Sequence, residues 1–97
     1  MKKNYFIRNT RLRQFMRRHT DNEQLIDTCI RVSGSLIGFS CNDETQFYKE
    51  DRQFMKKLKS FPNEKIDNNP IWLNHYHARI EGPKLIKLVK EDIRHMA

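Results

Sequence analysis

The sequence is poor in cysteine and in long hydrophobic runs. It has two cysteines, Cys29 and Cys41, which are too few for a disulfide framework and are expected to be free thiols. The longest apolar stretch, residues 32–39, is interrupted by serine and glycine and is far shorter than the ~20 residues that a membrane-spanning helix needs. Arg8 directly follows the short apolar run at residues 5–7, so we expect no signal-peptide core. We therefore expect a cytoplasmic protein without a membrane partner.

The hydrophobic fraction of 37% is below the 45–50% that is usual for globular chains. Six phenylalanines, three tyrosines and one tryptophan compensate in part, because aromatic side chains bury the largest area per residue. A chain of 97 residues is long enough for one domain with a modest core. We expect residues 1–97 to form a single small domain.

Motifs for catalysis or for cofactor binding are missing. His75 and His77 lack the i, i+3 or i, i+4 spacing of helical metal ligands, and the two cysteines lack finger spacing. Cys29 lies on an apolar stripe, where a thiolate is disfavoured and core packing is expected. No glycine-rich loop has the pattern of a phosphate-binding motif. The sequence therefore predicts no enzyme, no metal and no cofactor.

Acidic residues are missing from the first twenty positions, which hold seven lysines and arginines. The rest of the chain contains twelve basic and twelve acidic residues, so the formal net charge of +7 belongs to this segment. We describe residues 1–20 as a basic arm or helix and residues 21–97 as a charge-neutral helical body. Such a block indicates an anionic partner. The alternative is a solvated arm, but apolar residues such as Phe15 and Met16 lie between the arginines.

Apolar residues recur at helical spacing along most of the chain, which predicts an all-α bundle of about four to five short helices. The expected helices cover residues 4–19, 21–37 and 44–60, one from Pro70 to Gly82, and a last one after Pro83. Thr20 and Glu23 form a predicted capping box for the second helix. Residues 62–69 are expected to be a loop, and Gly82–Pro83 is expected to end one helix and start the next. A short hairpin at residues 31–41 is an alternative to the end of the second helix.

Candidate binding residues fall into two groups. The arginines favour bidentate contact with carboxylate or phosphate, and the predicted electrostatic contacts are Arg8, Arg11, Arg13, Arg17 and Arg18. Trp72 and Tyr76 are candidate apolar anchors of an interface, although a lone tryptophan is as readily a core residue. Pro70 follows a polar loop, in which X-Pro bonds can populate both isomers, and is the expected contact for a prolyl isomerase; Pro62 is the second candidate.

The basic residues are poorly placed for sequence-specific reading of DNA. A helix-turn-helix protein carries its cations on the second, recognition helix, whereas residues 21–60 here hold basic and acidic residues in near balance. Sequence-independent phosphate binding stays open.

The length, the lack of a catalytic motif and the opening residues MKKNYFIRNTRLRQF resemble the small anti-RecBCD proteins of temperate lambdoid phages. The resemblance implies a phage protein that acts in the host cytoplasm. It would bind the host RecBCD helicase–nuclease through its RecC subunit and inhibit or modify the processing of DNA ends, which protects phage DNA and favours phage recombination. It also implies a host peptidyl-prolyl isomerase as an additional partner, and DNA contact that is only indirect or weak. The alternative is a small basic regulator that binds nucleic acid.

Overall fold

The computed structural model describes residues 11–37, 44–74 and 76–95 of the chain. Every regular element within these residues is helical, as the sequence predicts. The elements in chain order are α1 (Arg11–Arg17), α2 (Glu23–Ile37), α3 (Glu44–Ser60), α4 (Asn63–Asp67), the 3-10 helix η2 (Pro70–Asn74) and α5 (Tyr76–Arg94).

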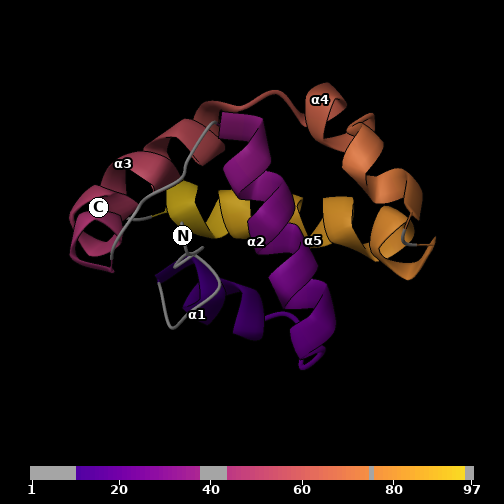
Figure 1. Ribbon diagram of the computed structural model, residues 1–97, viewed down its shortest axis with the longest axis horizontal. Coiled ribbons are helices and arrows are strands. Elements are labelled where there is room, and N and C mark those ends of the chain that lie inside the picture. Colours follow the sequence, from indigo (N-terminus) through magenta and orange to yellow (C-terminus); the bar gives the residue numbers. More distant parts are fainter. Residues whose placement is uncertain (1–10, 38–43, 75, 96–97) are drawn as a thin grey trace.

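The last helix, α5, is the centre of the arrangement, because it contacts each of the other five elements. Figure 1 shows α2 crossing α5, with α1 below this crossing. In the same view α3 lies on the side of the C-terminal end of α5, and α4 lies on the other side. An apolar stripe along α5 makes these contacts possible, and its buried residues are Leu85, Ile86, Val89 and Ile93.

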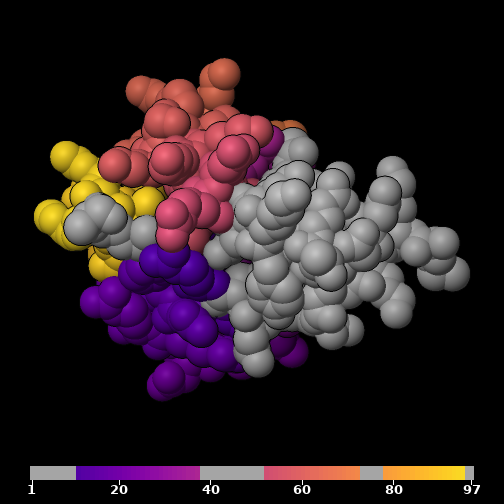
Figure 2. Space-filling view, turned by 90° about the vertical axis from the view of Figure 1, so that its left-hand side faces the viewer, coloured from indigo at the N-terminus to yellow at the C-terminus, as the bar shows by residue number. Residues whose placement is uncertain are grey.

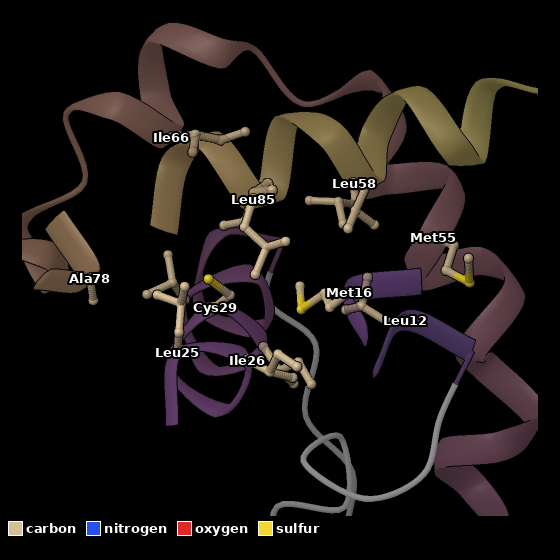
Figure 3. Close-up of a cluster of buried hydrophobic side chains, with 14 of the residues drawn as sticks. Leu12, Met16, Leu25, Ile26, Cys29, Met55, Leu58, Ile66, Ala78 and Leu85 are labelled. Carbon is tan, nitrogen blue, oxygen red and sulfur yellow. The ribbon is translucent and has the colours of Figure 1, made fainter. Parts of the chain in front are cut away.

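A single cluster of buried side chains joins the elements. Each of α1, α2 and α3 contributes apolar residues three or four positions apart, which lie on one face of a helix. The buried residues from these helices are Leu12, Met16, Leu25, Ile26, Cys29, Ile30, Val32, Phe54, Met55 and Leu58. Figure 3 shows side chains of α1, α2, α3 and α5 directed towards one another. The apolar stripes predicted from the sequence are therefore the buried faces.

Helix α2 begins differently from the predicted capping box. The side-chain oxygen of Asn22 accepts a hydrogen bond from the backbone N–H of Leu25 at 3.1 Å, which makes Asn22 the N-cap. Thr20 accepts instead from the N–H of Asn22 at 3.2 Å. Glu23 is directed to arginines of α1 rather than back to Thr20. The prediction of a Thr20–Glu23 box was wrong because Asn22 is also a favourable cap residue and lies two residues closer to the start of the helix.

The prediction that Gly82–Pro83 ends a helix is also wrong, because α5 continues through Pro83. Gly82 lies against the indole of Trp72, and a Cβ atom at this position would be 2.5 Å from Trp72 Cζ3. The Gly82 carbonyl also accepts a hydrogen bond from Cys29 Sγ at 3.7 Å. Pro83 is buried. Tertiary packing against Trp72 and α2 thus offsets the cost of a proline within a helix, which is ~3 kcal/mol or more.

The segment between α3 and α5 is more ordered than the predicted loop. It contains α4, whose Ile66 is fully buried. The helix predicted from Pro70 to Gly82 is instead the short η2 followed by the start of α5. Asn69 caps η2, since its Oδ1 accepts a hydrogen bond from the N–H of Ile71 at 2.9 Å. Residues 31–37 are helical, so the hairpin alternative is wrong for them; residues 38–41 lie outside the described residues.

Candidate functional site

The described part of the basic segment is a helix packed on the body of the protein. Leu12 and Met16 of α1 are 1% and 0% exposed, which anchors α1 in the core. Residues 11–17 are therefore part of the fold and are not the solvated arm that the sequence left as an alternative. Figure 2 shows α1 on the same face as α3 and the C-terminal part of α5. Arg8 lies outside the described residues.

Arg13 is directed inwards, against the prediction that it meets a partner. Its residue is 4% exposed, and its guanidinium donates to Glu23 Oε1 at 3.1 Å and to Asp27 Oδ1. Both acceptors belong to α2, so Arg13 joins α1 to α2. The prediction was wrong for this residue because the spacing of Arg13 relative to Leu12 and Met16 turns it towards α2, where two carboxylates lie one turn apart.

Arg17 remains at the surface but is paired as well. Its guanidinium donates to Glu23 at 2.7 Å, and 44% of its side chain is exposed. The hydrogen bond with Arg17 holds the pKa of Glu23 below its ordinary value, and the same contact raises the pKa of Arg17. Glu23 therefore stays ionised and compensates part of the charge of α1.

Arg18 directly follows α1. Its side chain is 62% exposed, compared with 44% for Arg17. Its guanidinium lies 5.6 Å from the ring centre of Phe15, in cation–π range. It is 3.9 Å from Asp92 of α5, which also contacts His19 at 2.7 Å. Arg11 is exposed at the first position of α1. Cations of the basic segment thus reach the surface at both ends of α1.

Trp72 does not form an interface anchor in this structure. It is 1% exposed, and its indole N–H donates to the Ile66 carbonyl at 2.6 Å. The prediction of a partner contact is corrected to the alternative that the sequence allowed, a core residue. Tyr76 begins α5, and its side chain lies outside the described residues, so its role stays a prediction.

The three prolines differ in accessibility. Pro70 is exposed at the first position of η2, and Pro62 is exposed at the N-cap of α4. Pro83 is buried within α5. An isomerase can therefore reach the two prolines that the sequence singled out, and it cannot reach Pro83 while α5 is folded.

Sequence reasoning missed a second basic surface, which lies in the body that was expected to be neutral. An open groove of about 540 Å³ runs beside α5, and its lining residues are Lys59, Asn63, Lys84, Lys87, Leu88, Lys90, Glu91 and Arg94. Five of these residues are basic and one is acidic. Leu88 is 48% exposed. We name this surface the α5 groove.

Two of the groove lysines differ in their surroundings. Lys90 Nζ donates to the Phe61 carbonyl and to Asn63 Oδ1, so Lys90 fastens α5 to the link between α3 and α4. Desolvation lowers the pKa of Lys90, and the neighbouring Lys87 lowers it further. Lys87 is paired with Asp67 of α4 at 2.7 Å. In the sequence, the spacing of Lys84, Lys87 and Arg94 could have indicated a basic face on this helix. It could not have indicated that Lys59 of α3 lines the same groove.

The histidine, cysteine and acidic side chains of the described residues indicate a function less clearly than these two basic surfaces do. Among the described residues, no group of three or more histidine, cysteine, aspartate or glutamate side chains is arranged to hold a metal ion. Burial raises the pKa of the Cys29 thiol to about 12, so this group is protonated near neutral pH, as expected of a core cysteine. None of the described helices combines the length and apolar character needed to cross a membrane.

Comparisons of the chain with known protein families, with curated proteins and with solved structures find no match. The assignment of function therefore depends on the surfaces described above and on the resemblance of the opening residues.

Proposed function

We propose that this protein is a non-catalytic binding protein that attaches to the host RecBCD helicase–nuclease through RecC and inhibits or modifies its processing of DNA ends. The observation that carries the proposal is the exposed arginine surface at the end of α1, formed by Arg17 and Arg18. The partner is named from the resemblance of the opening residues to anti-RecBCD proteins. This activity takes place in the host cytoplasm and protects phage DNA.

The arginine surface suits attachment to a protein because it is held by the fold. Leu12 and Met16 are buried and Arg13 joins α1 to α2, so Arg17 and Arg18 project from a fixed helix end. A fixed position reduces the conformational entropy that a charged side chain loses on binding. Arginine is also enriched at the energetically important positions of protein interfaces.

The test is affinity purification of the tagged protein from bacterial lysate, with and without nuclease treatment. We expect RecB, RecC and RecD to be recovered in both conditions. A double variant, Arg17→Gln with Arg18→Gln, should lose most of this recovery. Arg13 is left in place because its substitution would disturb the fold. Recovery of no RecBCD subunit with the unaltered protein would falsify the proposal.

The matched control carries Arg31→Gln and Arg52→Gln, which remove the same charge from exposed positions of α2 and α3. This control should keep wild-type recovery of RecBCD. An equal loss in both double variants would show that net charge, rather than the end of α1, determines attachment.

The same purification tests the isomerase contact. We propose that Pro70 is the residue that a host peptidyl-prolyl isomerase binds, because it is exposed next to a polar link. Pro70→Ala should remove the isomerase from the recovered proteins, and Pro62→Ala, at a proline that is also exposed, should not. Retention of the isomerase by the Pro70 variant would contradict this assignment.

A further inference from the structure

We propose that the α5 groove binds the phosphate backbone of duplex DNA without reading its sequence. This site is separate from the arginine surface of α1 and does not depend on the identity of the protein partner. The groove lies between the C-terminal end of α3, the start of α4 and the face of α5 from Lys84 to Arg94.

The charge of the groove favours an anion. Lys87 and Arg94 each have one carboxylate partner, Asp67 and Glu91 respectively. Within the described residues, Lys59 and Lys84 form no ion pair and are exposed. Lys90 is held by oxygens of Phe61 and Asn63. The groove therefore carries an excess of positive charge that the fold itself leaves uncompensated.

The dimensions suit a nucleic-acid backbone. Lys84 and Arg94 are separated by about 15 Å along α5 at the helical rise of about 1.5 Å per residue. One strand of duplex DNA advances about 3.4 Å along the duplex axis per phosphate, so a length of about 15 Å along that axis corresponds to about four phosphate positions. The groove is open along its side, so a long polymer can pass through it without threading an end.

The residue types distinguish between classes of partner. Lysine is depleted at protein–protein interfaces, whereas lysine ammonium groups supply sequence-independent phosphate contacts. Single-strand binders stack bases on aromatic side chains, and no described residue lining the groove is aromatic. Among anionic partners, the duplex backbone therefore fits the groove better than an acidic protein or a single strand.

The test measures fluorescence anisotropy of a labelled duplex of random sequence at 50 to 200 mM NaCl, with the full chain. We expect binding that weakens with salt and does not change with sequence. The variant Lys59→Gln with Lys84→Gln should bind more weakly and should lower the slope of log Kd against log salt by about two, since each lost phosphate contact removes about one unit. Lys87 and Lys90 are left unchanged because both make contacts within the protein.

Two matched control variants test whether the loss of DNA binding is specific to the groove lysines. Lys57→Gln with Lys65→Gln removes the same charge from exposed lysines that do not line the groove, and it should retain the wild-type salt slope. The Arg17→Gln, Arg18→Gln variant should also retain it. If only this arginine variant loses DNA affinity, the DNA site lies on α1 and the proposal is wrong.

Three further outcomes would overturn the assignment: no duplex binding at 50 mM NaCl, tighter binding of a labelled single strand than of the duplex, or displacement of the duplex by polyglutamate at equal charge concentration. The last result would assign the groove to an acidic protein. Because this assay contains no RecBCD, its failure leaves the proposed attachment to that enzyme unaffected, and failure of the purification experiment leaves the groove assignment intact.

Discussion

The contact between Gly82 and Trp72 decides what residue can occupy position 82. The nearest indole atoms, Cζ3 and Cη2, are 2.5 and 2.7 Å from the place where a Cβ atom would be. The indole is buried and is held by its hydrogen bond to Ile66, so it has little freedom to move away. A glycine here is required by close packing and not by a turn.

Gly82→Ala should therefore lower the free energy of unfolding by about 1–3 kcal/mol, the usual cost of overpacking a core. The sign of this change in unfolding free energy is informative, because replacing glycine by alanine within a helix otherwise stabilises a protein by up to about 1 kcal/mol. Urea denaturation followed by circular dichroism gives this free energy. Lys84→Ala, at an exposed position of the same helix, is the control and should change stability by less than about 0.5 kcal/mol. An alanine variant as stable as the wild type would contradict the close contact.

Helix α1 has seven residues, which is too short to be stable alone in water. It depends on the burial of Leu12 and Met16 and on the ion pairs of Arg13 with Glu23 and Asp27. The two carboxylate side chains are 50% and 40% exposed, so they can be rehydrated if Arg13 is removed. Removing Arg13 should therefore lose the free energy of its charge-assisted hydrogen bonds. It should not add the further penalty of a buried carboxylate without a partner.

Arg13→Met should consequently destabilise the protein by about 1.5–3 kcal/mol, the range for hydrogen bonds to charged groups. Arg17→Met removes an exposed pair with the same Glu23 and should cost less than about 1 kcal/mol. Thermal or urea unfolding of the two variants measures the difference. Equal effects would show that Arg13 contributes no more than a surface arginine does, and that α1 is held by its apolar contacts alone.

Local sequence patterns predicted α2 and α3 well. A helix was expected at residues 44–60, and α3 spans Glu44–Ser60; the helix before it was expected to end at residue 37, where α2 ends. These helices have regular apolar stripes and no glycine–proline pair. The patterns failed at Gly82–Pro83, because local rules treat this pair as a helix end and contain no information about Trp72. They failed in the same way for the charged surfaces. Counting charges by segment could not show that Arg13 turns inwards or that Lys59 lies beside α5.

The folded chain is organised around α5, and the described helices share one buried cluster. The radius of gyration is 12.5 Å, close to the ~13 Å of a compact domain of about 100 residues. A helix removed from this arrangement would expose part of the same core. We therefore expect the elements to unfold together, which is the usual behaviour of small single domains.

Trp72 makes this expectation measurable, because it is the only tryptophan and it reports on the packing of η2 against Gly82 of α5. Far-ultraviolet circular dichroism reports instead on all helices. In urea, the tryptophan fluorescence and the dichroism should give the same midpoint and the same slope, as a two-state transition requires. Separate midpoints would mean that the η2–α5 contact unfolds independently of α1, α2 and α3. The Gly82→Ala variant serves as the control, since a cooperative fold transmits its local clash to both signals and shifts both midpoints equally.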